Sequence, residues 1–597
     1  MILVFGGTTE GRRVVEVLEE AGTRYYYSTK GGEKGQQVGV VNGIHITGGM
    51  DVAQMTAFCR DHGIRLVVDA AHPFAEALHR NLLLAAQQTG TPVIRYDRIY
   101  PKHDSNLTWC KDFNDAARQL AAQGVDRLLA LTGVNSIGRL KPFWEKHPEC
   151  WFRILNRQTS LRVAQANGFP EEQLVYYETD DTAQLIGQLR PDAVITKESG
   201  LSGGFTEKVE TARQAGVKVF VVERPPYPTG ESVETVFVNG PYGLRRAVER
   251  LLPQFYPLHS GLTTGTCATA AAVAACQLLR PEAAAPAEVP VVLPNGETIH
   301  VPVVYGDGYA SCFKEAGDDP DITDGIEVRA SVRQSDQFEI AGGEGVGTIT
   351  LPGFDYPPGS PAINKGPREM IRRNLGSRPL KVTIFIPNGA EIAKKTFNPR
   401  LGIEGGLSVI GVSGIVKPFS EAAFIDSIRK CMTIAKASGT ERVVINSGGK
   451  SERFVKALYP DLPQQAFVEY GNYVGETLKM ASELHIGRVT LGVMLGKAVK
   501  LAAGHLDTHS RKTTMDLDFI RQMLAEAGIA IDIGDITLAR ELWERIPAGQ
   551  LQTFCNVVIG HCRNHCVPLL PEGELTILLI GDDGTIYSLS QEHPQGQ

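Results

Sequence analysis

The sequence lacks an excess of basic residues. Its 60 Lys and Arg stand against 67 Asp and Glu, which gives a net charge of −7. A nucleic-acid-binding protein normally shows a basic excess. The sequence also lacks a long apolar run, since its longest uncharged apolar run, Cys267–Leu279, is too short to cross a bilayer. We therefore expect neither nucleic acid nor a membrane among its partners.

A regular cysteine framework is also missing. The ten cysteines are scattered along the chain, which is typical of a reducing compartment. The start, Met1–Gly7, has neither the basic segment nor the cleavage site of a signal peptide. We therefore expect a cytoplasmic protein. A chain of 597 residues is too long for one core, and its length suggests about three to four domains.

The first 252 residues alternate expected strands and helices. Residues 1–5 form a continuous apolar run, typical of a buried parallel strand, and a Gly-rich turn and an amphipathic helix follow. This order is the first half of a dinucleotide-binding unit, although the glycines do not fit G-x-G-x-x-G. We favour a nucleotide pyrophosphate at this turn over a plain tight turn, and we predict contacts from Gly6, Gly7, Thr8 and Thr9.

The choice of nicotinamide depends on the second expected strand, residues 23–28. An NAD site usually carries an acidic residue after this strand for the ribose hydroxyls. Here Thr29 and Lys30 follow instead. Lys30 suits a 2′-phosphate, which favours NADPH over NADH, although an exposed lysine is often only a solvated charge.

Two further segments follow expected strands, at the usual ligand position of an open α/β sheet. In Asp69–Ala75, His72 fits two roles equally: a catalytic proton donor or cofactor contact, or a capping residue before Pro73. The second segment, Thr196–Gly204, is a Gly/Ser-rich loop that carries its own lysine. We predict that it cradles an anion through Thr196, Lys197, Ser199 and Gly200.

These segments, together with Arg95-Tyr96 and Leu131–Gly133, occur in the order of the precorrin-6A reductase family, and residues 1 to about 250 resemble that family. The resemblance implies two Rossmann-like halves with a tetrapyrrole macrocycle in the crevice between them. It also implies hydride transfer from a reduced nicotinamide to carbon 19 of the ring.

A second unit follows the Pro-flanked linker Pro253–Pro257. Its first segment, Ser260–Leu279, runs from a hydroxyl- and glycine-rich turn into an Ala-rich, helix-prone stretch. One interpretation is an N-capped core helix. The other is an anion or cofactor site at the positive end of the helix, with Thr263, Thr264 and Thr266 as its ligands.

Another Gly-rich turn, Ser447–Ser451, follows an expected strand at Arg442–Asn446. About twenty residues later, Glu469 lies near the end of the next expected strand. An acidic residue at this distance from a Gly-rich turn is the ribose-binding pattern of nucleotide folds. We therefore predict that Ser447, Gly448, Gly449 and Glu469 bind an adenosyl cofactor.

Three other segments of this unit carry polar groups. The turn at Asp318–Gly325 fails the calcium-loop spacing, so an acidic surface turn is favoured over a group that orients a cation. His561–Cys566 offers four potential metal ligands but has no second Cys/His pair, and we expect no metal site. The Gly-rich stretch Phe397–Pro418 is almost uncharged after Glu404, so we expect a folded region in which Ser413, Gly414 and Lys417 could hold a polar ligand edge.

Residues from about 256 onward resemble the cobalt-precorrin-5B (C1)-methyltransferase family. The resemblance implies S-adenosylmethionine as the methyl donor, and an α+β subdomain followed by an α/β subdomain. Six segments carry it in order: Ser260–Ala272, Asp318–Gly325, Asn364–Met370, Phe397–Pro418, Gly471–Thr477 and Leu501–Ser510.

We therefore expect an α/β protein with three parts: 1–252, 256–400 and 401–597. The resemblances imply a bifunctional enzyme of anaerobic cobalamin biosynthesis. Its C-terminal half methylates ring carbon 1 of a cobalt-containing tetrapyrrole, and its N-terminal half then reduces cobalt-precorrin-6A. Candidate partners for the ring carboxylates are Lys197, Lys365, Arg368 and Arg400.

Two alternatives stay open. The protein could be a non-catalytic tetrapyrrole carrier or sensor that retains both folds, although the two intact cofactor turns speak against this. It could also be a short-chain-type oxidoreductase fused to another domain, which the missing Tyr-x-x-x-Lys pair disfavours.

Overall fold

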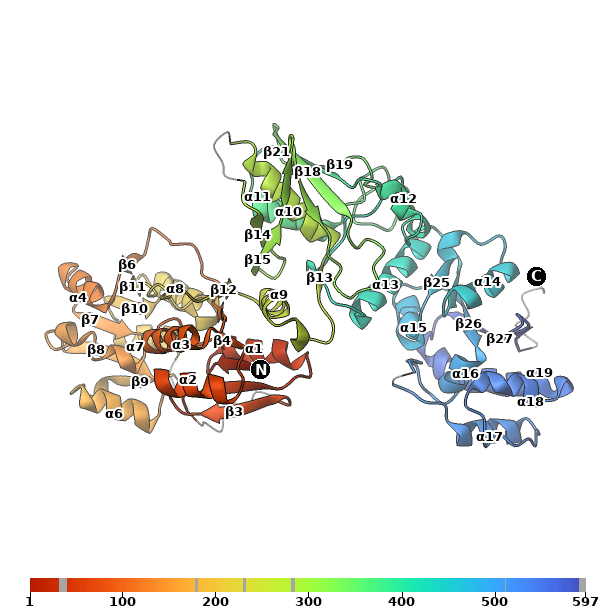
Figure 1. Cartoon of the computed structure of the whole chain (residues 1–597), viewed down its shortest axis with the longest axis horizontal. Coiled ribbons are helices and arrows are strands. Elements are labelled where there is room, and N and C mark those ends of the chain that lie inside the picture. Colours follow the sequence, from red (N-terminus) through yellow and green to blue (C-terminus); the bar gives the residue numbers. More distant parts are fainter. Residues whose placement is uncertain (32–39, 178–180, 229–231, 281–284, 511, 590–597) are drawn as a thin grey trace. The chain divides into compact units, whose positions relative to one another are not determined.

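A computed structural model describes residues 1–31, 40–177, 181–228, 232–280, 285–510 and 512–589 (Figure 1). The chain forms two compact units. The first comprises Met1–Ser260 and Pro290–His300, and the second comprises Gly261–Val289 and Val301–Gln597. The finer division of the chain at residues 252 and 400 remains our proposal.

The first unit contains two six-stranded sheets in which every pair of neighbouring strands is parallel. The first sheet has the order β12-β5-β4-β1-β2-β3. Its strands are β1 (Ile2–Phe5), β2 (Tyr25–Thr29), β3 (Gly43–Thr47), β4 (Leu66–Asp69), β5 (Val93–Tyr96) and β12 (Thr235–Val238), and its helices are α1 (Thr9–Glu19), α2 (Val52–Asp61), α3 (Glu76–Thr89) and α9 (Pro241–Leu251).

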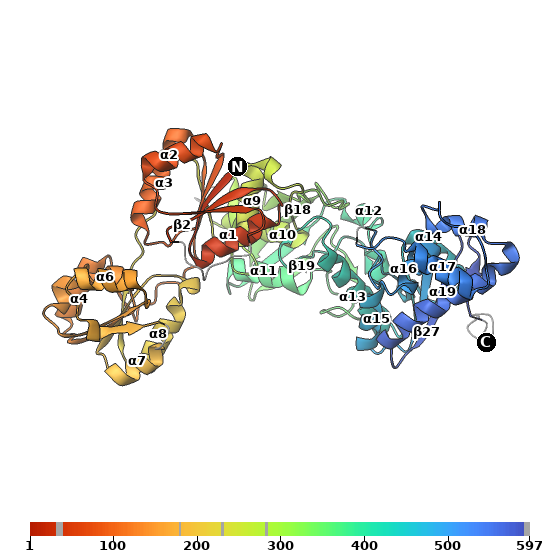
Figure 2. The same cartoon turned by 90° about the horizontal axis from the view of Figure 1, so that it is seen from below.

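The apolar run at the N-terminus explains why helices cover both faces of this sheet. Ile2 and Val4 pack in one cluster with residues of α1 and α9, while Leu3 and Phe5 pack in another with α2 and α3. Figure 2 shows these helix pairs on opposite faces of the sheet. A strand buried on both faces needs apolar residues throughout, as the sequence indicated.

The second sheet has the order β6-β11-β10-β7-β8-β9. Helices α4, α5 and α6 pack on one face, and α7 and α8 pack on the other. The strands are β6 (Thr108–Cys110), β7 (Arg127–Ala130), β8 (Glu149–Ile154), β9 (Leu174–Tyr176), β10 (Ala193–Lys197) and β11 (Lys218–Val222), and the helices are α4 (Phe113–Ala122), α5 (Lys141–Trp144), α6 (Gln158–Ala166), α7 (Thr182–Leu189) and α8 (Phe205–Gln214).

The first half is built from two separate stretches of the chain. Its last strand, β12, comes after the second half in the sequence and pairs with β5 at the edge of the first sheet. This return crossing ties the halves together. The Rossmann-like halves and the α/β class are as predicted.

The second unit begins with a mixed five-stranded sheet of order β16-β17-β18-β21-β19. The Ala-rich helix α10 packs against β17, β18 and α11 and is buried along nearly its whole length. The main elements are β16 (Val304–Gly306), β17 (Tyr309–Phe313), β18 (Glu327–Gln334), β19 (Glu339–Gly342), β21 (Leu380–Phe385), α10 (Thr264–Gln277), α11 (Lys365–Leu375) and α12 (Gly389–Ala393); the short strands are β13 (Gly261–Leu262), β20 (Thr348–Ile349), β22 (Ile403–Glu404) and β23 (Ile415–Val416). The division between the two units falls within the paired strands β14 (Glu288–Val292) and β15 (Thr298–Pro302).

The rest of this unit is an α/β layer with a sheet of order β25-β24-β26-β27-β28, parallel except for its last pair. An α+β part followed by an α/β part agrees with the prediction. The elements are β24 (Arg442–Asn446), β25 (Phe467–Glu469), β26 (Arg488–Met494), β27 (Glu574–Ile580), β28 (Ile586–Tyr587), α13 (Glu421–Ala437), α14 (Gly449–Leu458), α15 (Val474–Glu483), α16 (Leu495–Ala502), α17 (Leu517–Glu526), α18 (Leu542–Arg545) and α19 (Leu551–Cys566).

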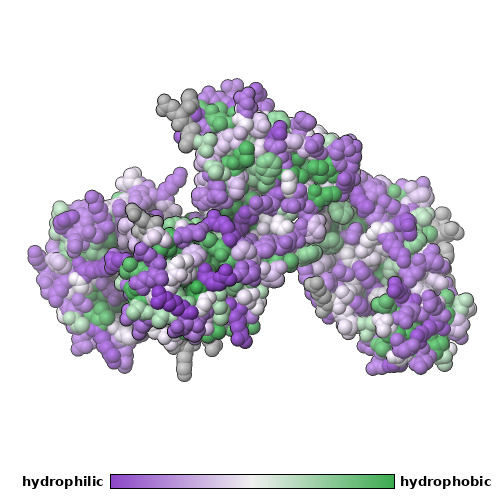
Figure 3. Space-filling model, viewed as in Figure 1, coloured by the Kyte–Doolittle hydropathy of each residue, from purple (hydrophilic) through white to green (hydrophobic). Residues whose placement is uncertain are grey.

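Hydrophilic residues cover most of the face seen in Figure 3, with smaller hydrophobic patches among them. Among the residues that the structure describes, we find no helix that is both long and apolar enough to span a membrane.

Candidate active sites

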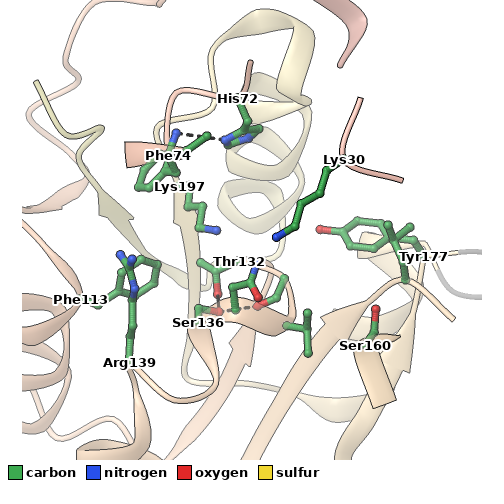
Figure 4. Close-up of a pocket in the computed structure, with 15 residues that line it drawn as sticks. Lys30, His72, Phe74, Phe113, Thr132, Ser136, Arg139, Ser160, Tyr177 and Lys197 are labelled. Atoms are coloured by element: carbon green, nitrogen blue, oxygen red, sulfur yellow. Dashed lines mark hydrogen bonds between the residues drawn. The ribbon is translucent and has the colours of Figure 1, made fainter. Parts of the chain in front are cut away.

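The first unit holds a cavity of about 620 Å³ whose lining comes from both halves (Figure 4). Lys30, His72 and Lys197 reach it from loops at the carboxyl ends of β2, β4 and β10. The described lining residues include the cations Lys30, Arg139 and Lys197 but no carboxylate. The cavity therefore suits a ligand with anionic groups. Its lining is Lys30, His72, Phe74, Ala75, Phe113, Thr132–Ser136, Arg139, Leu155, Ser160, Tyr177 and Lys197.

His72 is held as a neutral imidazole. The backbone N–H of Phe74 donates a hydrogen bond to its Nδ1 at 3.2 Å, so the ring proton lies on Nε2. Burial, together with the charges of Arg98 and Lys197, lowers the pKa of His72 to about 3. The ring can therefore donate a hydrogen bond at neutral pH. To act as an acid it needs a bound anion that raises its pKa, and its catalytic role remains a prediction.

A buried network fixes the loop that carries His72. Asp69 is fully buried and accepts hydrogen bonds from His79 at 2.6 Å, Tyr227 at 2.9 Å and Arg95 at 3.0 Å. Burial opposes ionisation, but the His79 hydrogen bond and the Arg95 charge hold the pKa of Asp69 below its usual value. The other ring nitrogen of His79 lies 3.1 Å from the carbonyl oxygen of His72. Sequence reasoning missed His79 and Tyr227, because only folding brings them to Asp69.

Lys197 lies at the end of β10 and points into the cavity (Figure 4). Its Nζ lies 5.2 Å from the ring centre of Phe74 and 5.7 Å from that of Phe113. Within the described part of the chain no carboxylate pairs with it. Burial, reinforced by Arg139 and Lys208, lowers its pKa to about 8. A carboxylate or phosphate in the cavity would stabilise the charged amine.

Thr196, in β10, and Ser199 and Gly200, in the loop after it, are all buried. Thr196 is buried, and its hydroxyl has no hydrogen-bond partner. The Ser199 hydroxyl donates to Gly203 O at 3.1 Å, and Gly200 adopts a φ of 70°. None of these three residues lines the cavity, and their role in binding remains a prediction.

The turn after β1 is tight. Gly7 adopts a φ of 91°, and its N–H donates to the Tyr27 hydroxyl at 3.1 Å. A Cβ atom at Gly6 would lie only 2.3 Å from the Tyr27 ring. The Thr8 hydroxyl accepts from Gly11 N at 3.1 Å and donates to Ala70 O at 2.8 Å, so it already has two partners.

Gly6–Thr9 are not among the cavity-lining residues, whereas Lys30 is. Thr9 accepts an exposed hydrogen bond from Arg12 at 3.3 Å. The first turn of α1 also holds the buried Glu10, which pairs with Arg98 at 2.7 Å. Arg98 also donates to Ser199 O at 2.7 Å, so it joins loops of both halves. Pyrophosphate binding at the turn remains a prediction.

The threonines that open α10 are engaged within the protein. Thr264 Oγ1 accepts from Ile410 N at 2.9 Å and donates to Ile410 O at 3.2 Å. Thr266 Oγ1 donates to Gly414 O at 2.6 Å, and Thr263 Oγ1 accepts from Thr266 N at 3.2 Å. This is the geometry of a capped core helix. A cofactor contact from these hydroxyls remains a prediction.

Glu469 lies beside the second nucleotide-type turn, Ser447–Gly449, as predicted from the order of strands. Asn446 pairs with Glu469 across the parallel strands β24 and β25, and a Cβ atom at Gly448 would lie 3.4 Å from Glu469 Oε1. Ser447 N donates to Ser451 Oγ at 3.1 Å, and Gly449 opens α14. Burial raises the pKa of Glu469, and the Arg400 charge opposes this shift.

A second cavity, of about 380 Å³, opens beside this turn. Lys497 Nζ donates to Gly471 O, and Lys500 Nζ to Thr508 O at 3.4 Å. Burial lowers the pKa of Lys497. Sequence reasoning assigned no role in binding to either lysine. The lining is Ser447, Asn472, Met494, Gly496, Lys497, Lys500, Thr508, His509 and Ser510.

The acidic turn is a structural element. Asp319 accepts from Phe419 N at 3.1 Å, Asp321 pairs with Lys314 at 2.7 Å, and Asp324 accepts from Ala316 N at 2.7 Å.

The segment His561–Cys566 lies in α19, with Cys562 and Cys566 buried and His561 2.7 Å from Glu526. In the described ranges, no group of three or more His, Cys, Asp or Glu could hold a metal.

Two family models match the chain. Residues 253–418 match the family described as CbiD, and residues 1–239 match the family described as precorrin-6x reductase CbiJ/CobK. A cobalt-precorrin-5B C(1)-methyltransferase of Prosthecochloris aestuarii is 40% identical over 362 residues, which cover 56% of this chain and 97% of the relative. One of Thermus thermophilus is 45% identical over 276 residues, which cover 45% and 75%.

Solved structures are similar to each part. The cobalamin biosynthesis protein CbiD of Archaeoglobus fulgidus matches 46% of this chain and 85% of its own, with 28% identity and a TM-score of 0.24. A CobK precorrin-6A reductase matches 42% and 96%, with 21% identity and a TM-score of 0.34.

Proposed function

Because this chain belongs to the cobalt-precorrin-5B C(1)-methyltransferase family and its residues 1–239 match the precorrin-6x reductase family, we propose that it carries out both reactions in sequence. It is a bifunctional enzyme of cobalamin biosynthesis. The second unit transfers a methyl group to ring carbon 1 of cobalt-precorrin-5B, and the first unit reduces the resulting cobalt-precorrin-6A. A non-catalytic carrier is not favoured, since both families are families of enzymes.

One observation supports both assignments: each unit has a cavity beside the carboxyl ends of parallel strands, lined by lysines. Open α/β sheets bind their ligands at this edge. Tetrapyrroles of this route carry carboxylates around the ring, and cationic side chains bind such groups. The fused chain also raises the local concentration of the intermediate.

We propose NADPH as the reductant of the first unit. The cationic cavity without a described carboxylate fits a phosphate, and Lys30 would be the partner of the 2′-phosphate. A bound nicotinamide would supply the hydride. His72, through its Nε2–H, would orient a ligand acceptor, while Lys197 would hold a ring carboxylate or move a proton.

We propose S-adenosylmethionine as the methyl donor of the second unit. Glu469 lies beside the Ser447–Gly449 turn, where its carboxylate can accept both ribose hydroxyls. A bound cofactor would supply an activated methyl group. Methyl transfer from a sulfonium needs alignment more than proton transfer, which agrees with a site that is built from a backbone turn, one carboxylate and lysines.

The test is incubation of the full chain with cobalt-precorrin-5B and S-adenosylmethionine, with and without NADPH, followed by mass spectrometry of the macrocycle. We expect one added methyl group without NADPH, and two further hydrogens with it. As matched variants, Glu469→Ala should slow methyl addition, and Lys197→Met should still add the methyl group but leave the product unreduced when NADPH is present. A wild-type chain that adds no methyl group would refute the proposal.

A further inference from the structure

The second unit presents apolar side chains to solvent from one loop, residues 410–419, which we call the apolar loop. Ile410, Val412 and Phe419 are 46%, 83% and 67% exposed. Ile322 of the acidic turn is 48% exposed, and this turn is joined to the loop by the Asp319–Phe419 hydrogen bond. Several strongly exposed apolar side chains on one segment and on the turn bonded to it make this part of the unit a candidate binding surface.

The loop is held rigidly despite its exposure. Both backbone groups of Ile410 bond to Thr264 Oγ1, and Gly414 O accepts from Thr263 N at 3.2 Å and from Thr266 Oγ1 at 2.6 Å. Gly411 has a φ of 150°, and a Cβ atom there would lie 2.3 Å from Thr263 Oγ1. The threonines that open α10 therefore fix the backbone while the apolar side chains point outward.

The backbone conformation of Phe419 is a second observation that points to a functional surface. It adopts a φ of 53°, a left-handed conformation that a bulky residue rarely takes. Strain of this kind persists only where the surroundings enforce it, and it concentrates at functional sites. The Asp319 carboxylate accepts a hydrogen bond from Phe419 N in this conformation.

The apolar loop runs toward the second cavity. Helix α13 begins directly after it, and a Cβ atom at Gly471 would lie 2.8 Å from the Phe424 ring of that helix. Lys512 joins Glu421 of the same helix, at 2.8 Å, to Asp507, at 2.9 Å. Asn472 and Thr508, which follow Gly471 and Asp507, line the cavity.

We propose that the apolar loop is the surface on which the tetrapyrrole lies during methyl transfer, with Thr264 as a positioning residue that holds it. This inference rests on the proposed function, which supplies a large planar substrate with apolar faces and a carboxylate rim. Exposed lysines border the loop and suit that rim: Lys417 lies within it, and Lys365 opens α11, where Gly366 approaches Gly411 O.

The test uses the full chain, cobalt-precorrin-5B and S-adenosylmethionine. Val412→Asp introduces a carboxylate where an anionic ring must lie, and we expect the KM for the tetrapyrrole to rise at least about tenfold, a loss of about 1.4 kcal/mol in transition-state stabilisation if kcat is unchanged. Calorimetric binding of S-adenosylhomocysteine should not change. Val304→Asp is the matched control, because Val304 is 55% exposed on strand β16, outside the loop.

Variants of Thr264 distinguish a role in positioning the apolar loop from a role in cofactor binding. Thr264→Val should raise the tetrapyrrole KM without changing S-adenosylhomocysteine binding, and Thr264→Ser, which keeps the hydroxyl, should restore wild-type values. If Val412→Asp leaves the KM unchanged in an active enzyme, or if Thr264→Val weakens S-adenosylhomocysteine binding instead, the inference is wrong. A wild-type chain without methyl transfer would instead refute the proposed function.

Discussion

Replacing Lys197 with methionine should stabilise the first unit while impairing its reductase activity. The ammonium group lies in a largely apolar part of the cavity, beside Phe74 and Phe113, with no carboxylate partner among the described residues. Burial and two neighbouring cations lower its pKa from 10.5 to about 8. Keeping this amine charged in the folded protein therefore costs free energy.

The size of that cost follows from the pKa change. At about 1.4 kcal/mol per pKa unit, a decrease from 10.5 to about 8 corresponds to about 3 kcal/mol at neutral pH. Methionine removes this cost and also loses the interactions with the two aromatic rings, worth about 0.5–2 kcal/mol. Desolvation is the larger effect, so we expect Lys197→Met to raise the free energy of unfolding by about 1–2 kcal/mol at pH 7.

The gain in stability from Lys197→Met should decrease as the pH rises. Between about pH 8 and 10.5 the unfolded state holds the lysine proton and the folded state has lost it, so wild-type stability rises with pH across this window. The advantage of Lys197→Met is therefore complete below about pH 8 and disappears toward pH 10.5.

The assay is urea unfolding followed by tryptophan fluorescence, which reports mainly on the first unit because three of the four tryptophans, Trp109, Trp144 and Trp151, belong to it. Lys30→Met, at an exposed lysine of the same cavity, is the control and should bring no such gain. A Lys197→Met chain that is less stable than wild type at pH 7, or a gain that persists at pH 10.5, would refute the reasoning.

Three other outcomes are expected. Glu469→Ala should raise the dissociation constant of S-adenosylhomocysteine at least about tenfold, since it removes two charge-assisted hydrogen bonds of roughly 1.5–3 kcal/mol each, and calorimetry should show NADPH binding unchanged. Lys30→Glu should weaken NADPH more than NADH; equal losses in the two titrations would place Lys30 away from the 2′-phosphate. Fragments 1–252 and 256–597 should each fold and keep their own activity, but the first should lose at least about 3 kcal/mol in urea unfolding. It lacks Glu297, which accepts from Tyr242 N and Gly243 N at the start of α9. It also lacks Phe255 and Tyr256, which are buried in the core of the first unit.

Much of the fold could be predicted because its signals are local. The apolar run at residues 1–5 and the Gly-rich turn after it predicted the first half of a dinucleotide-binding unit, and the alternation of strands and helices continues to residue 252. The two Rossmann-like halves and the α/β part of the second unit were implied by the family resemblances. The same local reasoning predicted that Glu469 lies beside the Ser447–Gly449 turn. Two parallel strands joined by one crossover connection end at the same edge of the sheet, and Glu469 is at the end of the second strand. The return of β12 to the first sheet has no local signal, because it is a pairing between residues 93–96 and 235–238.

The candidate sites were harder to predict, because a side chain's partner decides its role. Thr263, Thr264 and Thr266 have the composition of an anion cradle, yet the Thr264 and Thr266 hydroxyls donate to the carbonyl groups of Ile410 and Gly414, far along the chain. His72 was identified by its place after a strand, but only the fold shows that burial keeps the ring neutral and that a backbone N–H fixes its proton on Nε2.

The two cavities hold their buried lysines differently. Burial lowers the pKa of both Lys197 and Lys497, but the neighbouring Glu469 carboxylate opposes the shift at Lys497, whereas no described carboxylate pairs with Lys197. Folding alone gains nothing from an unpaired buried ammonium group, because its desolvation is not offset by a carboxylate. An anionic ligand would supply that partner, so part of the free energy that the fold gives up at Lys197 would be recovered only on binding. In the proposed function, this preorganised cation would favour a ring carboxylate or a phosphate of the cofactor.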